Sequence, residues 1–297
     1  ILVDGILVEQ NTKSWNGIRD TATALRLGNP TPSSSAAGLD GLMDNVRIYD
    51  YARTPAQIAW DYNRGAPVGH WRFDECQGTT AYDVSGNDNH GTINIGATAP
   101  QTTTGTCTDG SSASAWYNGA SGKWNSSLSF DGEDDYIEVG GDSTINVIDS
   151  ITVSAWIFPE QYKYAVIAQK TYNTGLSYSW AYKWRIEGQD LYFGLYDTGD
   201  SIHRLYFDPK PNLNEWTHIV ATYDGNIGKA YQNGIETDSF ESSFSLRNDS
   251  NGLLIGGVDG GSEFFDGQID DVRIYNYALT DEQVKTLYNQ GAVHFGD

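Results

Sequence analysis

Residues 40–66, DGLMDNVRIYDYARTPAQIAWDYNRGA, return without a gap as residues 266–292, DGQIDDVRIYNYALTDEQVKTLYNQGA, with 15 of 27 positions identical. The spacing between the two copies far exceeds the periods of about 20–50 residues that are typical of solenoid repeats. We therefore interpret the repeat as the end of a whole domain that occurs twice. Residues 1–65 are then the C-terminal part of a preceding, incomplete module, residues 66–291 are a complete module, and residues 292–297 start a following segment.

Short runs of β-branched and aromatic residues fill the complete module between turn signals such as Asp131-Gly132, Asp224-Gly225 and Asn233-Gly234. Such pairs are typical of turns between antiparallel strands. The composition agrees, with 33 Gly, 19 Tyr, 9 Trp and one Met in 297 residues. We predict an all-β sandwich of two antiparallel sheets, with strands at residues 69–74, 127–130, 136–139, 150–158, 164–170, 177–186, 191–196, 202–207, 216–223, 229–232, 252–256 and 267–275.

Each copy ends in one predicted helix. Thr54 and Thr280 are each followed three residues later by Gln, which is the capping-box pattern of a helix start. Gly65 and Gly291 lie where a helix end favours a residue that tolerates positive φ. Because both copies keep the same start and stop, we interpret this short C-terminal helix as a structural element that covers the sandwich.

The chain carries 39 Asp and Glu against 18 Lys and Arg, a formal net charge of -21 at pH 7. Phosphate backbones and anionic membrane surfaces would be repelled over the ~8–10 Å Debye length of physiological salt. No apolar run approaches the ~18 residues that a membrane-spanning helix needs. We therefore expect no nucleic-acid partner and no membrane insertion, and an acidic surface of this kind suits a calcium-containing extracellular medium.

Cys76 and Cys107 are the two cysteines of the chain, and they bracket a polar stretch rich in Thr, Gly and Ser. We predict that they form a disulfide, which would close a loop of ~30 residues and contribute on the order of 3 kcal/mol by restricting the unfolded chain. The alternative is a pair of inert thiols. A disulfide requires an oxidising compartment, which favours a secreted or cell-surface location.

Several longer motifs follow one another through the complete module in a fixed order. They resemble the motifs of a laminin G-like domain of the concanavalin A-like lectin/glucanase superfamily. The resemblance implies a concanavalin A-like jelly-roll sandwich, present here as one partial and one complete copy, whereas functions vary widely within this superfamily. The motifs are HWRFDE at residues 70–75, DVSGNDNHG at 83–91, LSFDGEDDY at 128–136, ITVSAWI at 151–157, EWTHIVATYDG at 215–225 and GQIDDVRIY at 267–275.

The loop of residues 83–89 concentrates Asp, Ser and Asn side chains, whose oxygens are the hard ligands that Ca²⁺ prefers. The resemblance implies that such domains bind calcium near this loop with the help of an acidic residue from the final strand. A further candidate ligand comes from an Asp-Gly turn. The alternative is that these residues form Asx-turns without an ion. The predicted ligand set is Asp83, Asn87, Asn89, Asp131 and Asp270.

Aromatic residues alternate through residues 178–184, so a regular strand would project them all from one face. Flat aromatic surfaces stack on the apolar faces of sugar rings, and related folds present glycans on the concave sheet. The opposing interpretation is that the rings fill the core between the sheets. For Trp184 we favour this core position. The predicted carbohydrate surface comprises Tyr178, Trp180, Tyr182 and, from the next strand, Tyr192 and Tyr196.

Catalytic patterns are not recognisable. Glucanases of the wider superfamily use carboxylates at alternate positions of one strand, because one attacks while another protonates the leaving oxygen. The acidic residues 133–138 have a different spacing, and strand alternation predicts that Asp270 and Asp271 lie on opposite faces of their sheet. Since no Ser-His-Asp grouping is recognisable either, we predict that this chain is not an enzyme.

The partial first copy should contain the closing hairpins, last strand and helix of a module without the strands that pair with them. Apolar edges such as residues 1–3 and 46–48 would then be exposed, which favours aggregation. The edges would be covered by the remainder of the module, by strands of another molecule or by the complete module itself.

These inferences favour a non-catalytic, calcium-stabilised module of a tandem-repeat surface or adhesion protein that binds glycan or protein ligands outside the cell. One alternative is a structural repeat that assembles fibres when neighbouring copies complete each other's sandwiches. Another is an accessory carbohydrate-binding module of a secreted glycan-degrading enzyme.

Overall fold

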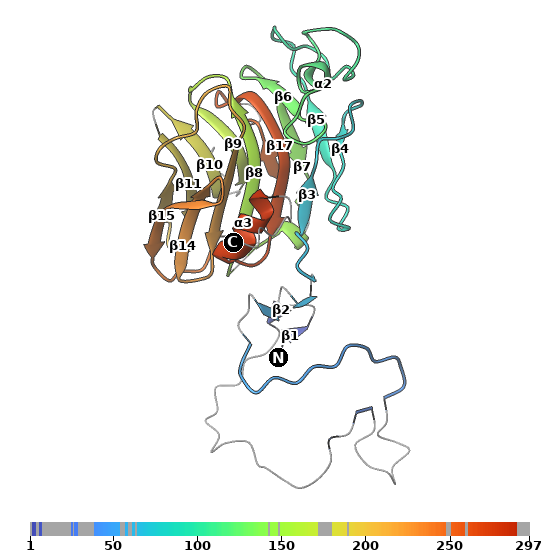
Figure 1. Cartoon of the computed structure of the whole chain (residues 1–297), viewed down its shortest axis with the longest axis vertical. Coiled ribbons are helices and arrows are strands. Elements are labelled where there is room, and N and C mark those ends of the chain that lie inside the picture. Colours follow the sequence, from blue (N-terminus) through green and yellow to red (C-terminus); the bar gives the residue numbers. More distant parts are fainter. Residues whose placement is uncertain are drawn as a thin grey trace, which may run out of the picture.

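The protein is described by a computed structural model of the whole chain. Figure 1 shows the arrangement of its strands and helices. The residues described are 2–3, 6–7, 25, 27–28, 39–53, 57–58, 61–62, 64–141, 143–147, 149–171, 180–188, 190–247, 251–258 and 261–289.

Two antiparallel sheets stack face to face in the complete module, which confirms the predicted all-β sandwich. The eight-stranded sheet has the spatial order β12 (Ile202–Tyr206), β11 (Asp190–Tyr196), β10 (Trp180–Glu187), β9 (Ala165–Thr171), β16 (Leu253–Ile255), β7 (Tyr136–Val139), β5 (Gly91–Asn94) and β4 (Thr80–Ala81). The seven-stranded sheet has the order β15 (Ile235–Glu241), β14 (Ile227–Gln232), β13 (Thr217–Tyr223), β8 (Ile151–Pro159), β17 (Asp266–Tyr275) and β3 (Gly69–Trp71), and β6 (Leu128–Asp131) also pairs with β17.

All twelve predicted strands are present, with ends that differ by a few residues. The sequence did not predict β4, β5 or β15, nor the short helix α2 (Ala115–Asn118) and the 3-10 turn η1 (Ser143–Ile145). β15 lies at the edge of its sheet, and its residues are half-buried or exposed along its whole length. An edge strand of this kind needs no apolar alternation, which explains why its polar sequence gave no signal.

The core lies between the two sheets and is rich in aromatic side chains. Trp71, Trp116, Trp184 and Phe193 have no exposed surface. Burying a side chain of this size contributes roughly 1.5–3 kcal/mol relative to leaving it in water. Trp184 therefore belongs to the core, which confirms the position favoured for it from the sequence.

The helix α3 (Asp281–Tyr288) begins with the predicted capping box. Thr280 accepts a hydrogen bond from the Gln283 amide, and the Gln283 side chain accepts one from the Thr280 amide. Val284 is fully buried against a small cluster that includes Val220 and Tyr231, on the face of the seven-stranded sheet that is turned away from the core. The helix therefore covers the sandwich, as predicted.

The cysteines form the predicted disulfide between Cys76 and Cys107, and the alternative of two inert thiols is wrong. The Cys107 amide also donates a backbone hydrogen bond of 3.1 Å to the Cys76 carbonyl. This link fastens the stretch that leads to α2 onto the sandwich. Among the described residues, no helix is long and apolar enough to cross a bilayer.

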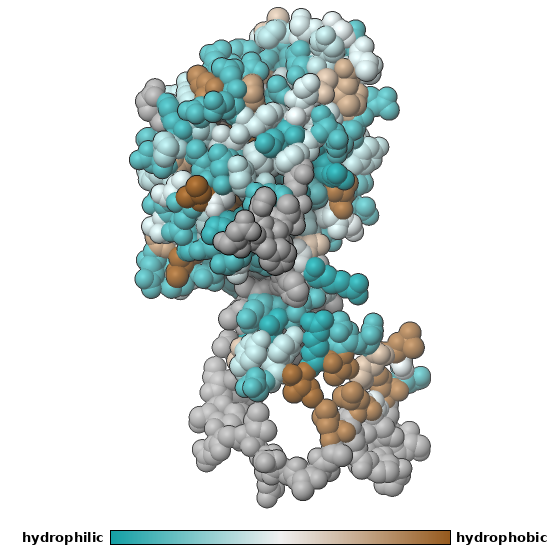
Figure 2. Space-filling model, in the orientation of Figure 1, coloured by the Kyte–Doolittle hydropathy of each residue, from teal (hydrophilic) through white to brown (hydrophobic). Residues whose placement is uncertain are grey.

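The partial first copy forms a small hairpin of β1 (Leu2–Val3) and β2 (Ile6–Leu7). Residues 39–53 run as an extended trace without any assigned strand (Figure 1), so the predicted last strand is absent from this described stretch. The apolar side chains of this trace are exposed and appear brown in Figure 2; Leu42 is 102% exposed and Ile48 72%. The physical reason is pairing, because the corresponding run in β17 pairs with β8 on one side and with β3 and β6 on the other.

Two further predictions concern the ends of the helices. Gly65 adopts the expected positive φ of 79°. Of the helix predicted after Thr54, residues 57–58 and 61–62 are described and are helical. Gly291 and residues 292–297 lie outside the described part of the chain.

Candidate functional site

The predicted aromatic surface is divided by a β-bulge in β10. The pairing with β9 shifts register between Trp180 and Tyr182, so the two rings face opposite sides of the sheet. Tyr182 packs in the core and is 3% exposed. Its prediction as a sugar-binding residue is therefore wrong, because a strand with a bulge does not keep a period of two. Burial raises the pKa of Tyr182, and Tyr178 lies outside the described residues.

The outer face of the eight-stranded sheet, turned away from the core, carries the other predicted rings. Trp180 lies against the backbone of β11, where a Cβ added to Gly194 would come within 2.6 Å of the Trp180 ring. Its ring centroid is 4.6 Å from that of Tyr196, edge to face. Trp180 and Tyr192 are only 7% and 3% exposed, whereas Tyr206 is 43% exposed.

Tyr206 is a candidate site residue that the sequence analysis missed. It is the register partner of Tyr192, and the two ring centroids are 5.9 Å apart. The signal was available in the alternation of β12, where buried Leu205 implies that its neighbours face outward. The rings of Trp180, Tyr192, Tyr196 and Tyr206 therefore form one outward-facing aromatic surface across three strands.

Positively charged side chains are interspersed with these rings. The Arg204 guanidinium, from β12, lies 5.2 Å from the Tyr192 ring centroid. On the other neighbouring strand, β10, Arg185 is the register partner of Tyr192. Lys183 and Arg185 both form ion pairs with Glu263. Burial lowers the pKa of Lys183 although Glu263 counteracts the shift. Trp180 and Tyr192 are too buried to stack on a ligand, so the surface offers the Tyr206 ring and the N–H donors of Arg204.

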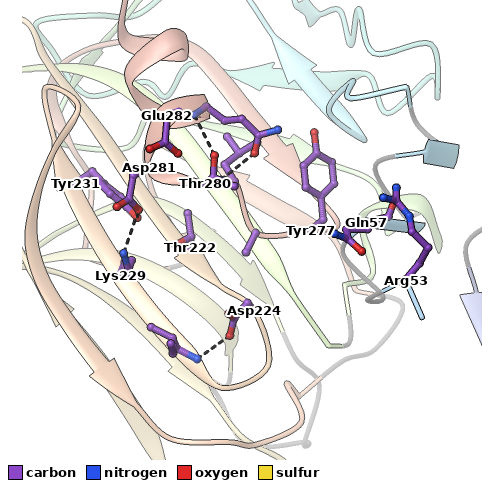
Figure 3. Close-up of a pocket in the computed structure, with 14 residues that line it drawn as sticks. Arg53, Gln57, Thr222, Asp224, Lys229, Tyr231, Tyr277, Thr280, Asp281 and Glu282 are labelled. Carbon is purple, nitrogen blue, oxygen red and sulfur yellow. Dashed lines mark hydrogen bonds and ion pairs between the residues drawn. The ribbon is translucent and has the colours of Figure 1, made fainter. Parts of the chain in front are cut away.

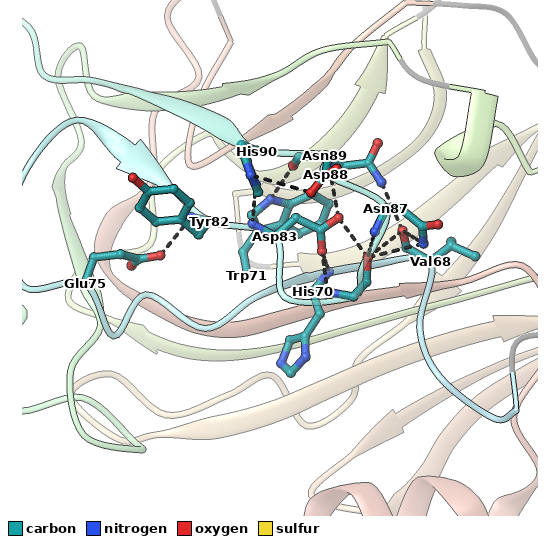
Figure 4. A network of polar contacts seen from close by, with 11 residues as sticks. Val68, His70, Trp71, Glu75, Tyr82, Asp83, Asn87, Asp88, Asn89 and His90 are labelled. Atoms are coloured by element: carbon teal, nitrogen blue, oxygen red, sulfur yellow. Dashed lines mark hydrogen bonds and ion pairs between the residues drawn. The ribbon is translucent and has the colours of Figure 1, made fainter.

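The loop of residues 83–89 is held together by its own hydrogen bonds (Figure 4). The Asp83 carboxylate accepts from the amides of His70, Ser85 and Asn89, at 2.8–3.0 Å, and from the Ser85 hydroxyl. The side-chain amides of Asn87 and Asn89 both donate to the Val68 carbonyl at 3.0 Å. These contacts match the alternative of ion-free turns, and they fasten the loop to β3.

Asp131 belongs to a different cluster, with Asp134 and Asp135, whose carboxylate oxygens lie within 4.8 Å of one another. They accept hydrogen bonds from the backbone amides of residues 96, 98 and 101. Burial and the charge of Asp131 raise the pKa of Asp135 to about 7. Asp131 pairs with Asp266, four residues along β17 from Asp270, which is roughly 13 Å.

Asp270 is likewise remote from the loop of residues 83–89. That loop pairs with the far side of β3, and β3 in turn pairs with β17. Two strand spacings amount to roughly 10 Å. The prediction of a single ligand set is therefore wrong, because its five residues are divided among three separate networks.

The network around Asp270 contains unsatisfied oxygens. Asp270 is fully buried; its Oδ2 accepts from the Trp124 amide at 2.8 Å, and its Oδ1 has no hydrogen-bond partner. Asp74 Oδ1 also has none, while Asp74 Oδ2 lies 3.4 Å from Asn125 Nδ2 and 3.4 Å from Arg72 Nε. Burial, with the added charges of Asp271 and Asp74, raises the pKa of Asp270 to about 8. Two neighbouring carboxylates with free, buried oxygens fit a cation, and the sequence analysis missed Asp74.

Asp271 behaves in the opposite way. Although burial opposes the shift, hydrogen bonding to His70 and the charge of Arg273 hold the pKa of Asp271 below its usual range. Asp270 and Asp271 line the same cavity of about 760 Å³. The prediction that they lie on opposite faces is wrong, because β17 has a bulge between Asp270 and Arg273.

A second cavity, of about 750 Å³, lies beside α3 and brings the two copies together (Figure 3). Arg53 and Gln57 of the first copy line it together with Tyr277 of the complete module. On its far side, Asp281 accepts from Lys229 at 3.0 Å and from the Tyr231 hydroxyl at 2.7 Å. Residues of both copies line this cavity, and its polar groups Lys229, Tyr231 and Asp281 are paired with one another. We therefore interpret it as a contact between the copies and not as a ligand site.

One contact resembles a catalytic pair. Ser154 Oγ lies 2.9 Å from His218 Nε2, and both residues are buried. Burial lowers the pKa of His218 to about 3. The rings of Trp156 and Tyr288 lie against His218, so a substrate has no access to the serine.

The two stacked sheets define an antiparallel β-sandwich with aromatic residues on the outer face of one sheet. A model of the laminin G family, in the concanavalin A-like lectin/glucanases superfamily, matches residues 1–59 and 131–285. Since these residues make up more than half of the chain, the chain belongs to this family. No match was found among curated proteins.

Solved structures share the fold. Domain 4 of AbnA, an extracellular arabinanase from Geobacillus stearothermophilus, in complex with arabinotriose, is 23% identical, with a TM-score of 0.55 over 75% of this chain and 98% of that domain. The binding domain of botulinum neurotoxin serotype G is 16% identical, with a TM-score of 0.55 over 75% of this chain and 51% of that one. For the binding domain of Paraclostridial Mosquitocidal Protein 1 the values are 16%, 0.56, 77% and 53%. The chain thus spans about half the length of these toxin domains.

Proposed function

We propose that this chain is a non-catalytic, glycan-binding laminin G-like module of an extracellular surface protein. The observation that carries the proposal is the exposed Tyr206 ring beside the exposed Arg204, on the outer face of the sheet where Tyr192 and Trp180 pack beneath them. Aromatic rings offer large apolar faces together with hydroxyl groups for hydrogen bonding. A structural neighbour that binds arabinotriose supports a saccharide ligand, and the disulfide supports an oxidising, extracellular location.

A glycan array probed with the whole chain tests this function. Tyr206→Ala removes a ring that is 43% exposed on the proposed surface, and Tyr117→Ala removes one that is 40% exposed on α2. Losing a ring that stacks on a sugar removes roughly 1–2 kcal/mol, or about tenfold in affinity. The first variant should lose binding and the second should keep it. Equal loss in both variants, or no binding by the unmodified chain, would contradict the proposal.

The module is also proposed to bind structural calcium, at a site that shares only Asp270 with the ligand set that the sequence suggested. Asp74 and Asp270 would hold the ion, because each has a buried oxygen without a partner. Calcium takes carboxylate and carbonyl oxygens in flexible geometry. A bound ion would compensate the charge of Asp270, whereas Asp74 is already paired with Arg72. It would also fasten residues 124–125 to β17, because Trp124 contacts Asp270 and Asn125 contacts Asp74.

The second candidate function is a structural repeat that assembles fibres. The exposed residues 40–49 favour it, since their pattern forms a fully paired strand in the second copy. Strands of neighbouring copies would complete the sandwich. Sedimentation over a range of concentrations separates this candidate from the first, because fibre assembly predicts ordered multimers and a soluble binding module predicts monomers.

The third candidate is an accessory carbohydrate-binding module of a secreted glycan-degrading enzyme. The similarity to nearly the whole of an arabinanase domain favours it. The array distinguishes it from an adhesion module by ligand type, since an accessory module should prefer the plant or microbial polysaccharides that such an enzyme degrades.

A further inference from the structure

Charge is distributed unevenly over this molecule. The chain as a whole has more than two acidic residues for each basic one. On the outer face of β10–β12, however, the row Arg185–Tyr192–Tyr206 lies beside the row Lys183–Gly194–Arg204. These six neighbouring positions hold three cations. The acids that contact them lie outside the two rows: Glu263, Glu187, which accepts from the Tyr192 hydroxyl at 3.2 Å, and Asp238, which accepts from the Tyr206 amide at 2.8 Å.

The three cations differ in how they are paired. Lys183 and Arg185 share Glu263, and Arg185 also lies 3.3 Å from Glu187. Arg204 is exposed, and its described contacts are with the Tyr192 ring and hydroxyl. No ion pair joins Arg204 to an acid within the described ranges. A guanidinium has five N–H donors, so those that do not contact the Tyr192 hydroxyl are available to a ligand.

The geometry suits one sugar unit with a charged substituent. Neighbouring strands are roughly 4.8 Å apart, so Arg185 and Arg204 flank Tyr192 within about 10 Å. The exposed Tyr206 ring adjoins Tyr192 in the same row. A sugar ring lying against Tyr206 would therefore place its substituents within reach of Arg204.

We propose that the ligand of this surface is an anionic saccharide, whose carboxylate or sulfate group binds Arg204 while its ring packs against Tyr206. A guanidinium presents two parallel N–H donors that match the paired oxygens of either anion. Tyr192 supports the guanidinium from below through the cation–π contact. This inference rests on the proposed glycan-binding function and names the class of glycan.

Two matched pairs of oligosaccharides test the inference by calorimetric titration of the whole chain. The first pair is oligogalacturonate and its methyl ester, and the second is a carrageenan oligosaccharide and its desulfated form. The two pairs distinguish a carboxylate from a sulfate. In at least one pair, the anionic member should bind roughly tenfold more tightly than its neutral partner. That difference should shrink at high salt, because exposed charges are screened.

Arg204→Gln should reduce binding of the anionic member about tenfold and leave binding of the neutral one unchanged. Lys285→Gln removes a cation from the exposed side of α3, away from this surface. It should change binding of neither the anionic nor the neutral oligosaccharide. Thermal unfolding of each variant verifies its fold, which the exposed position of Arg204 should preserve.

The anionic inference is overturned if neutral members bind as tightly as charged ones, or if Arg204→Gln binds like the unmodified chain. A third outcome overturns the anionic inference and leaves the proposed function intact. In that case neither pair binds, but the array identifies neutral ligands whose binding is abolished by Tyr206→Ala. If no saccharide binds in either assay, both the function and its refinement are wrong.

Discussion

The proposed calcium site predicts a coupling between pH and stability through Asp270. Without an ion, the folded protein raises the pKa of Asp270 to about 8 from the ordinary value of 3.8, because the carboxylate is buried beside Asp271 and Asp74. The folded state then keeps a proton that the unfolded chain releases. Stability from this group is therefore fully present below about pH 4, falls as the pH rises and levels off above about pH 8.

The magnitude follows from the size of the shift. Each pKa unit corresponds to ~1.4 kcal/mol, so the rise from pH 5 to pH 8 costs about 4 kcal/mol in the calcium-free protein. For a domain of about 150–250 residues, that corresponds to a melting temperature lower by roughly 8–16 °C. Calcium at 100 times its Kd would restore ~2.7 kcal/mol, or roughly 5–11 °C.

The assay compares three proteins by thermal unfolding at pH 5 and pH 8.5, with calcium and with a chelator. Asp270→Asn removes the charge, so it should gain stability relative to the unmodified protein as the pH rises and should lose the calcium response. Asp88→Asn removes an exposed carboxylate, 92% exposed, from the loop of residues 83–89. It should keep both responses of the unmodified protein.

Two results would refute the reasoning. If Asp270→Asn is stabilised by calcium as strongly as the unmodified protein, the ion binds elsewhere. If the difference in melting temperature between Asp270→Asn and the unmodified protein is the same at both pH values, Asp270 is already ionised in the folded state.

Three further changes have defined outcomes. Replacing Cys76 and Cys107 by Ser removes a link across 31 residues and should lower the free energy of unfolding in urea by ~3–4 kcal/mol; an unchanged midpoint would contradict this. Thr280→Ala breaks the capping box of α3 and should cost ~1 kcal/mol in thermal unfolding, whereas Thr280→Ser should cost little. Gly194→Ala brings a Cβ within 2.6 Å of the Trp180 ring, so it should shift tryptophan fluorescence and weaken glycan binding. Gly199→Ala is the control, because its Cβ would lie 3.3 Å from Asp197 Oδ1, and it should change neither property.

Strands were predictable from the sequence wherever one face of the strand is buried. β8 and β13 are buried along nearly their whole length, and their apolar runs marked them clearly. β15 was missed because an edge strand with a polar sequence, IETDSFE, has no such constraint. The helix α3 was predicted because its start depends on a local contact between Thr280 and Gln283.

The candidate site was less predictable, since it depends on bulges and on contacts between distant residues. A bulge in β10 separates Trp180 from Tyr182, and the sequence carries no period that marks it. Asp74 and Asp270 are brought together through the separate stretch of residues 124–125. The sequence identified Asp270 as a candidate ligand but assigned it the wrong neighbours, because tertiary pairing and not residue type decides which carboxylates meet.

The two copies of the repeat show the same principle for the backbone. Residues 40–49 and 266–275 share Asp-Gly, a later Asp and the run Val-Arg-Ile-Tyr. The second copy is β17, which pairs with β3, β6 and β8 and buries Val272 and Ile274 completely. In the first copy the matching Val46 and Ile48 are 48% and 72% exposed. Since the sequence pattern is shared, the difference comes from the partner strands. The first copy therefore retains the capacity to pair on both edges, and an exposed, apolar segment of this kind is a template for another strand.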